Sequence, residues 1–312
     1  MAAAPRVPLQ GRDLLSVADL SPEEVEGLLA RGLALKRGDP PHPITGKSVA
    51  LLFEKPSLRT RVSFDVAIAS MGGHPIYLGA QEVGLGVREP VRDVARVLGR
   101  MVDAIVCRTF AQQTLEELAR HAPVPVINAL SDSEHPCQAL ADVMTMWERL
   151  GRIRGVVVAF VGDGNNCAAS LALACASLGA HYRIASPPGY ELPRGVVERA
   201  LALASRTGAS FTLLRDPDEA VAGADVVYTD VWTSMGQEAE AAVRRLVFAN
   251  YRVTPERMGR AAPHALFMHP MPVHYGEEVP PGFLESPWSV AYDQAENRLH
   301  IQKAVLEAIL AP

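Results

Sequence analysis

The chain has 312 residues, of which 48% are hydrophobic, and a formal net charge of −5. This length predicts roughly two domains, each large enough to bury a core of its own. Positive charge is not in excess, so nucleic acid and membrane surfaces are not expected as partners. The first residues lack the apolar stretch of a secretory signal, and the longest uncharged run, 164–180, is short for a membrane span. We therefore expect a cytoplasmic protein.

Strands and helices alternate in the first half of the chain. A capping box at Ser21–Glu24, with proline at the first helical position, predicts a helix to about Leu35. Further helices are predicted from Ser57 to the Gly72-Gly73 pair, over 91–101 and 114–121, and from the segment Ser131–Gln138 to about Leu150. Strands are predicted over 48–53, 75–78, 103–107 and 124–128. A polar, glycine-rich segment covers 79–90.

The alternation resumes after residues 151–155, which mark a boundary between two units. Strands are predicted over 156–161, 182–185, 211–214 and 226–229, with a further one that ends at His269. An apolar helix is predicted after the turn 162–166, ending at Leu178, and two more helices over 196–204 and 297–310. This order predicts an α/β fold of two domains, each a mostly parallel sheet flanked by helices. No internal repeat is apparent.

The run Phe53–Arg61 is the most informative segment. A buried strand stops there, and a helix begins after Ser57, a favourable N-cap, with Arg59 and Arg61 in its first turn. Free amides at a helix start, the positive end of the helix dipole and two arginines would bind a phosphate. A plain capped helix with solvated arginines fits the same residues.

Two further positions in the first half could carry chemistry. Arg108 follows a strand, so it would emerge at the carboxyl edge of the sheet, where α/β proteins bind ligands; an ion pair at the rim is the alternative. His135 lies at a helix start with Gln138 one turn on, so an imidazole and an amide could face one ligand, although a lone histidine is also a common structural residue.

The second half offers three strand ends. The turn Gly162–Asn166 resembles half of a dinucleotide fingerprint but lacks its third glycine. Segments 230–236 and 268–272 could supply a carboxylate and backbone carbonyls to a cationic amine, or could be packed loops. The four cysteines (107, 137, 167 and 175) lack metal-ligand spacing, so we expect reduced and mostly buried thiols.

Taken together, the order and spacing of these segments resemble the ornithine carbamoyltransferases, within the aspartate/ornithine carbamoyltransferase superfamily. Ser57-Leu-Arg-Thr-Arg61 is similar to the carbamoyl-phosphate signature, and His135-Pro-Cys-Gln138 to the block that holds the carbamoyl group. Asp230 with Ser234-Met-Gly236 favours an ornithine-type acceptor over aspartate. The resemblance runs from Gly11 nearly to His300.

The resemblance implies transfer of the carbamoyl group of carbamoyl phosphate to the δ-amine of L-ornithine, in arginine biosynthesis or degradation, without cofactor or metal. It implies that carbamoyl phosphate is bound by Ser57, Leu58, Arg59, Thr60, Arg61, Arg108, His135, Gln138 and Arg298, of which Thr60, Arg108, His135 and Arg298 polarise the carbonyl. Ornithine would be bound by Asn166, Asp230, Ser234, Met235, Pro270 and Met271.

For the domains, the resemblance implies a carbamoyl-phosphate domain at 1–134 with the final helix 297–311 packed back on it. An interdomain helix at 135–150 and an ornithine domain at 151–296 complete the chain, with two interdomain helices joining the domains. Closure of the domains would align amine and carbonyl. A homotrimer, or a multiple of trimers, is also implied.

Two segments depart from the family pattern. His269-Pro-Met-Pro272 stands where ornithine enzymes usually have His-Cys-Leu-Pro, so Pro270 replaces a cysteine, as in aspartate enzymes. Gly84 aligns where members offer a glutamine to the neighbouring subunit, so either Gln81 or Arg88 substitutes or the intersubunit contact is absent. Alternatives to the ornithine enzyme are a transferase for modified ornithine, putrescine or aspartate, a nucleotide-binding dehydrogenase, and an inactive binding homologue.

Overall fold

The computed structural model describes residues 7–312, which form two compact units. The first runs to Met144 and includes Glu296–Pro312, and the second is Thr145–Ala295. All strand pairs in both sheets are parallel, so the predicted α/β fold with two mostly parallel sheets is confirmed. Among the described residues, no helix is both apolar and long enough to cross a lipid bilayer.

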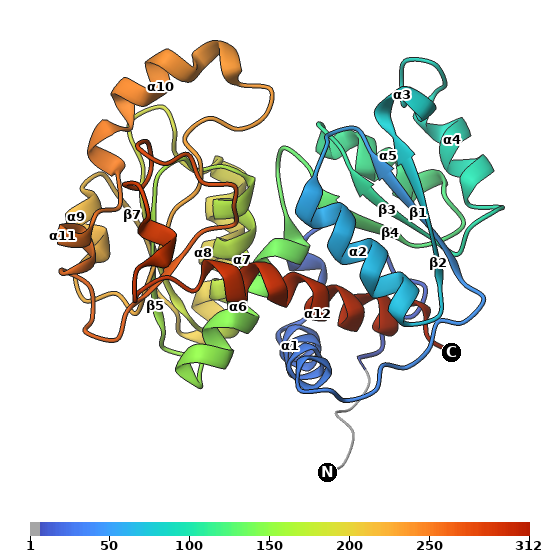
Figure 1. Ribbon diagram of the computed structural model, residues 1–312, viewed down its shortest axis with the longest axis horizontal. Helices are drawn as coiled ribbons and strands as arrows, with labels where there is room; N and C mark the ends of the chain where they lie inside the picture. Colours follow the sequence, from blue (N-terminus) through green and yellow to red (C-terminus); the bar gives the residue numbers. More distant parts are fainter. Residues whose placement is uncertain (1–6) are drawn as a thin grey trace. The chain divides into compact units, whose positions relative to one another are not determined.

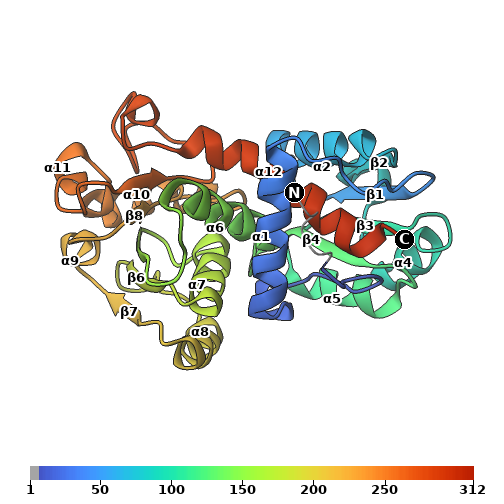
Figure 2. The ribbon, with the colours of Figure 1, turned by 90° about the horizontal axis from the view of Figure 1, so that it is seen from below.

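The first unit contains a sheet in the order β2-β1-β3-β4. Its strands are β1 (Ser48–Phe53), β2 (His74–Gly79), β3 (Ala104–Arg108) and β4 (Val126–Leu130). Its helices are the 3₁₀ turn η1 (Val17–Asp19), α1 (Pro22–Lys36), α2 (Leu58–Ser70), α3 (Ala80–Val83), α4 (Val91–Leu98) and α5 (Gln112–His121). Helix α2 lies on one face of the sheet and α5 on the other (Figures 1 and 2). Apolar residues of α4 and α5 pack against Ala50, Leu52 and Ile105.

The second unit contains a sheet in the order β7-β6-β5-β8-β9. Its strands are β5 (Val157–Val161), β6 (His181–Ala185), β7 (Phe211–Leu214), β8 (Val226–Tyr228) and β9 (Leu266–Met268). Its helices are α7 (Asn166–Leu178), α8 (Arg194–Thr207), α9 (Pro217–Val221), α10 (Ala241–Val247) and α11 (Pro255–Met258), with 3₁₀ turns η2 (Glu238–Glu240), η3 (Ala249–Tyr251) and η4 (Phe283–Glu285). Helices α6 (Pro136–Leu150) and α12 (Ala291–Leu310) each contain a unit boundary.

The strand orders place the loops of interest at similar points in the two sheets. In the first sheet the order reverses between β1 and β3, and in the second between β5 and β8. Ligands of open parallel sheets bind outside the carboxyl ends of strands at such a reversal. The loops after β1 and β3 carry Ser57 and Thr109, and those after β5 and β8 carry Asn165 and Asp230. Each unit therefore has a ligand-binding position of the expected kind.

Several element bounds differ from those predicted. Helix α12 begins at Ala291, six residues before the predicted start at 297, and β4 is shifted by two residues. The sequence did not predict α3, α9, α10 or α11, which are all short. All four cysteines are buried and none forms a disulfide.

Candidate functional site

The predicted phosphate segment forms a capped helix start. Ser57 is the N-cap of α2, and its hydroxyl accepts a hydrogen bond from the Thr60 amide at 3.2 Å. Arg59 is half-buried, and burial lowers the pKa of its guanidinium. Within residues 7–312, Arg59 makes no ion pair with a carboxylate. A partly desolvated cation at a helix N-terminus favours an anionic ligand.

Arg61 is placed differently from Arg59. It is exposed, and its guanidinium carbon lies 3.6 Å from the centre of the Tyr77 ring on β2. Such stacking stabilises a cation over an aromatic face. The structure thus gives Arg61 a contact that the sequence did not suggest.

Four of the predicted catalytic residues are buried in the first unit. Thr60, Arg108, His135 and Arg298 are each at most 5% exposed. The Nη2 of Arg298 donates to the Thr60 hydroxyl at 2.7 Å, across 238 positions of the chain. Burial holds the pKa of His135 well below its ordinary value, and the charges of Arg298 and Arg108 lower it further. The structure therefore brings these residues together as two guanidinium groups beside a neutral imidazole.

Lys55 is a further member of this positive group, which the sequence pattern did not indicate. Lys55 is 8% exposed, and its Nζ lies 4.4 Å from the centre of the Phe110 ring. Burial lowers the pKa of Lys55, and the charge of Arg108 lowers it further. A buried lysine just before the phosphate helix adds a positive charge that can attract an anion. The sequence signal that could have indicated this role was its place within the Phe53–Arg61 run, between Glu54 and Pro56.

Gln138 has one half of its amide fixed. Its Nε2 donates to Asp142 Oδ1 at 2.8 Å, one turn along α6. Its Oε1 is buried and has no hydrogen-bond partner among the described residues. A buried acceptor of this kind can take a hydrogen bond from the NH₂ group of a ligand. Asp142, which orients the amide, was not predicted.

In the second unit, Asp230 is joined to the turn after β5. Asn165 is the N-cap of α7, accepting from the amides of Cys167 and Ala168, and its Nδ2 donates to Asp230 Oδ2 at 2.8 Å. The other carboxylate oxygen accepts from the Val231 amide at 2.8 Å. The sequence did not reveal this contact of Asn165, and the ornithine-binding role expected for its neighbour Asn166 stays a prediction.

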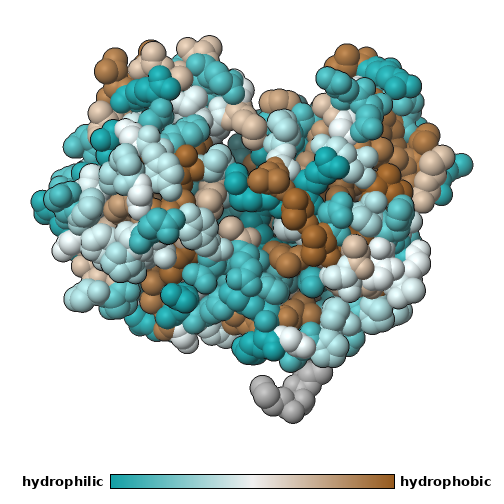
Figure 3. Space-filling model, viewed as in Figure 1, coloured by the Kyte–Doolittle hydropathy of each residue, from teal (hydrophilic) through white to brown (hydrophobic). Residues whose placement is uncertain are grey.

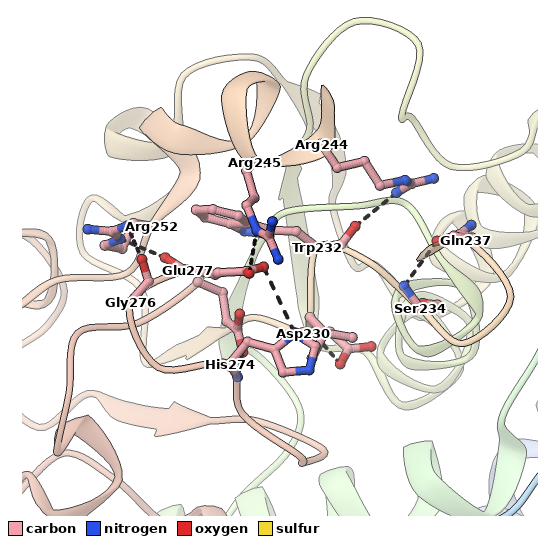
Figure 4. A network of polar contacts seen from close by, with 12 residues as sticks. Asp230, Trp232, Ser234, Gln237, Arg244, Arg245, Arg252, His274, Gly276 and Glu277 are labelled. Atoms are coloured by element: carbon pink, nitrogen blue, oxygen red, sulfur yellow. Dashed lines mark hydrogen bonds and ion pairs between the residues drawn. The ribbon is translucent and has the colours of Figure 1, made fainter. Parts of the chain in front are cut away.

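Ser234 and Met235 belong to the loop that follows Asp230. The Ser234 amide donates to Gln237 Oε1 at 3.1 Å (Figure 4). Met235 is 45% exposed. Within residues 7–312, neither makes a hydrogen bond to Asp230. The structure therefore does not bring them into the hydrogen-bonded group around Asp230.

The His269–Pro272 segment is held by groups that the sequence did not reveal. The Nδ1 of His269 accepts from the Met271 amide at 2.9 Å, so Nε2 carries the proton and donates to Glu278 Oε1 at 3.2 Å. The His269 amide donates to Gln294 Oε1. Met271 has a φ of +57°, and Pro270 is buried. Both Glu278 and Gln294 are fully buried.

Residues 274–278 follow that segment. Arg245 donates to the Glu277 carboxylate at 2.7 Å, and Arg252 donates to the backbone oxygens of Gly276 and Glu277 (Figure 4). His274, Glu277 and Glu278 place three potential metal-ligand atoms within 4.8 Å of one another. Both glutamates also bind protein groups, since Glu278 accepts from the His274 amide at 2.6 Å.

Comparisons with known proteins agree along nearly the whole chain. Residues 12–148 match the model "aspartate/ornithine carbamoyltransferase, carbamoyl-P binding domain", and residues 154–309 match "aspartate/ornithine carbamoyltransferase, Asp/Orn binding domain". An ornithine carbamoyltransferase of Pyrococcus abyssi is 52% identical over 97% of each chain. The anabolic ornithine carbamoyltransferase of Pyrococcus furiosus is 51% identical over 97% of this chain and 98% of that one.

Solved structures give the same result. The ornithine carbamoyltransferase of Pyrococcus furiosus has a TM-score of 0.94 at 51% identity, covering 97% of this chain and 98% of that chain. The anabolic enzyme of Campylobacter jejuni has a TM-score of 0.91 at 37% identity, covering 95% and 97%. The resemblance found in the sequence is confirmed: the chain belongs to the aspartate/ornithine carbamoyltransferase family.

Proposed function

We propose that this protein transfers the carbamoyl group of carbamoyl phosphate to the δ-amine of L-ornithine, giving L-citrulline and phosphate. Full-length relatives of about half identical sequence carry the name of this activity. The observation that carries the proposal is the buried group of Thr60, Arg108, His135 and Arg298, which gathers hydrogen-bond donors and positive charge in one place. The anabolic relative supports a role in arginine biosynthesis.

The donor group suits the charge that develops in this reaction. The amine nitrogen bonds to the carbamoyl carbon, the bond from that carbon to the phosphate oxygen breaks, and the leaving phosphate takes the electron pair while the amine loses a proton. Negative charge builds on the carbonyl oxygen during the attack. Thr60, neutral His135 and the two guanidinium groups would donate to it, and donors fixed in advance stabilise the transition state more than the ground state.

The phosphate would be held at the start of α2. Ser57, Leu58, Arg59, Thr60 and Arg61 supply first-turn amides, hydroxyls and two guanidinium groups. Buried Lys55 adds charge that a leaving phosphate requires. In the same proposal, the buried acceptor of the Gln138 amide, Oε1, binds the carbamoyl NH₂ group.

Ornithine would be bound by the loops of the second unit. Asp230, held by Asn165, supplies a carboxylate to the cationic α-amino group. We place Asn166, Ser234 and Met235 on the amino acid end, and the backbone of Pro270 and Met271 near the δ-amine. A backbone carbonyl can orient an amine without the thiol that other members carry there.

A citrulline assay tests the proposal. Purified protein with carbamoyl phosphate and L-ornithine should form citrulline, whereas aspartate, putrescine and acetylated ornithine should give little product. Arg59→Ala should raise the KM for carbamoyl phosphate and lower kcat. Product with aspartate but none with ornithine would assign the protein to a related transferase. Aspartate is included because Pro270 stands where aspartate enzymes also have a proline.

We also propose that the protein assembles as a homotrimer or a multiple of trimers. Leu58, Val62 and Val66, spaced by four residues on α2, are 73%, 51% and 43% exposed, and hydrophobic surface is visible over this helix in Figure 3. An apolar stripe of this kind favours burial against another chain. Light scattering should give a trimer or its multiple, and Val66→Glu should lower the mass. A monomeric wild type would contradict the assembly.

The cytoplasmic location stays a prediction, which cell fractionation tests.

A further inference from the structure

Arg244 on α10 is a buried cation that contacts two separate loops. Its side chain is 7% exposed. One nitrogen, Nη1, donates to Asp163 Oδ2 at 2.8 Å and to the backbone oxygen of Trp232 at 2.9 Å. Its Nε donates to Glu240 Oε2 at 3.0 Å, and its guanidinium carbon lies 4.8 Å from the centre of the Tyr190 ring. Figure 4 shows Arg244 reaching down from its helix to Trp232.

The two loops that Arg244 joins are those of the proposed ornithine site. Asp163 lies in the turn after β5, two residues before Asn165. Trp232 lies in the loop after β8, two residues beyond Asp230. The loops are thus linked twice, once by the bond from Asn165 to Asp230 and once through Arg244. The start of the Asp230 loop is also held by the Thr229 hydroxyl, which donates to the Val161 backbone oxygen at 2.7 Å. Arg244 adds a link two residues beyond Asp230, so the loop is constrained on both sides of that carboxylate.

Arg244 also compensates a pair of carboxylates. Burial raises the pKa of Asp163, the hydrogen bond and charge of Arg244 lower it, and the charge of Asp230 raises it again. The two acids therefore repel each other across a poorly solvated space. Without the guanidinium group, the repulsion would be relieved by movement of one loop or by protonation of Asp163. Loop movement would change the position of the Asp230 carboxylate, and protonation of Asp163 would change the electrostatic potential at it.

We propose that Arg244 is a positioning residue that fixes Asp230 for binding of the amino acid acceptor. The inference rests on the proposed function and goes beyond it, because it gives a role to a residue outside the groups proposed to bind ornithine. Arg244→Met should raise the KM for ornithine by roughly tenfold or more, while the KM for carbamoyl phosphate should change by less than about threefold. A tenfold change corresponds to about 1.4 kcal/mol of binding free energy.

The partner of Arg244 gives an independent test. Asp163→Asn removes the charge of the acceptor but keeps its shape, so it should raise the ornithine KM in the same direction. If both residues act through one link, the double variant should be no worse than Arg244→Met alone. Arg244→Lys keeps the charge without the fork of donors, and it should recover part of the affinity.

A matched control separates positioning from general stability. Arg257→Met breaks another ion pair of the same unit, in which Nε donates to Asp218 at 2.7 Å, and its arginine side chain, like that of Arg244, is largely buried, at 11% exposed. Both methionine variants should lower the melting temperature, but only Arg244→Met should change the ornithine KM. An unchanged ornithine KM in Arg244→Met, or an equal rise in Arg257→Met, would overturn the inference.

Failure of this inference can be told from failure of the proposed function. If the wild type forms no citrulline, the proposed function is wrong. If the wild type is active and the Arg244 variants match it, only the positioning role is wrong. Should Arg244→Met fail to fold, Asp163→Asn and Arg244→Lys carry the same comparison of the two KM values.

Discussion

Thr60→Val tests whether a buried hydroxyl takes part in carbonyl activation. A hydroxyl offers one proton and two acceptor lone pairs. One lone pair of Thr60 accepts from Arg298 Nη2 at 2.7 Å, so the proton remains for another acceptor. Valine has nearly the same shape, so the substitution removes the polar group and leaves the packing largely intact. We expect it to remove one donor to the carbonyl oxygen and the acceptor of a buried guanidinium.

The two losses have different magnitudes and different readouts. Losing one donor to a developing oxyanion costs a factor of roughly 10²–10³ in kcat. Losing a hydrogen bond to a charged group costs about 1.5–3 kcal/mol of stability. In a domain of this size, each 1 kcal/mol lowers the melting temperature by roughly 2–4 °C. Thr60→Val should therefore be both much slower and several degrees less stable.

Citrulline formation at varied carbamoyl phosphate and ornithine, together with thermal unfolding, measures both effects. Thr60→Ser keeps the hydroxyl and should recover most of kcat. A Thr60→Val variant that retains kcat within about threefold of the wild type would refute the reasoning, because the hydroxyl would then give nothing to the transition state. A loss of stability without a loss of rate would assign Thr60 to holding Arg298 alone.

Three further predictions concern other parts of the chain. Gly164→Ala should lower the melting temperature and raise the ornithine KM, because an added Cβ would lie 2.3 Å from the backbone nitrogen of Leu192. Gly195→Ala is the control and should do neither, because the space around its Cβ is open. Because the pKa of His135 is lowered in the folded state, below about pH 6.5 the unfolded state takes up a proton on this residue that the folded state does not. The free energy of unfolding should therefore fall by about 1.4 kcal/mol for each pH unit of acidification in that range. His135→Gln should flatten this slope, measured by chemical unfolding at pH 5–8. Arg31→Met should cost about 3–5 kcal/mol in the same assay, because it removes the cation from buried Glu307 and leaves that carboxylate with the His42 amide as a donor. Replacing both Arg31 and Glu307 with apolar residues should cost less, and equal costs would contradict this account.

The signals that succeeded in the sequence are local ones. The N-cap at Ser57 and the capping box at Ser21 depend on residues within three positions, and both are present in the structure. The final helix was predicted to start six residues late because 291–296 lack an apolar period. Gln294 in that stretch is buried through its bonds to the His269 amide and the Tyr228 hydroxyl, which no local pattern could reveal.

The residues that were missed are linked across long stretches of chain. Asn165 meets Asp230 across 65 positions, and Arg244 meets Asp163 across 81. Such partners are recognisable only when the strand order is known, because it decides which loops share an edge of the sheet. The family resemblance pointed to Asn166 as an ornithine ligand, and nothing local in the sequence pointed to Asn165, the N-cap of α7, as a partner of Asp230.

By itself, the sequence determined the family, the alternation of strands and helices, and the loops that carry polar residues, because each of these depends on short-range order along the chain. Only the tertiary structure decided that β1 lies beside β3 and β5 beside β8, and that Arg298 meets Thr60. Those contacts join residues far apart in the chain, and many strand pairings compete to form them. The pairing that forms is the one with the lowest free energy for the whole packed fold, which no short segment of sequence determines.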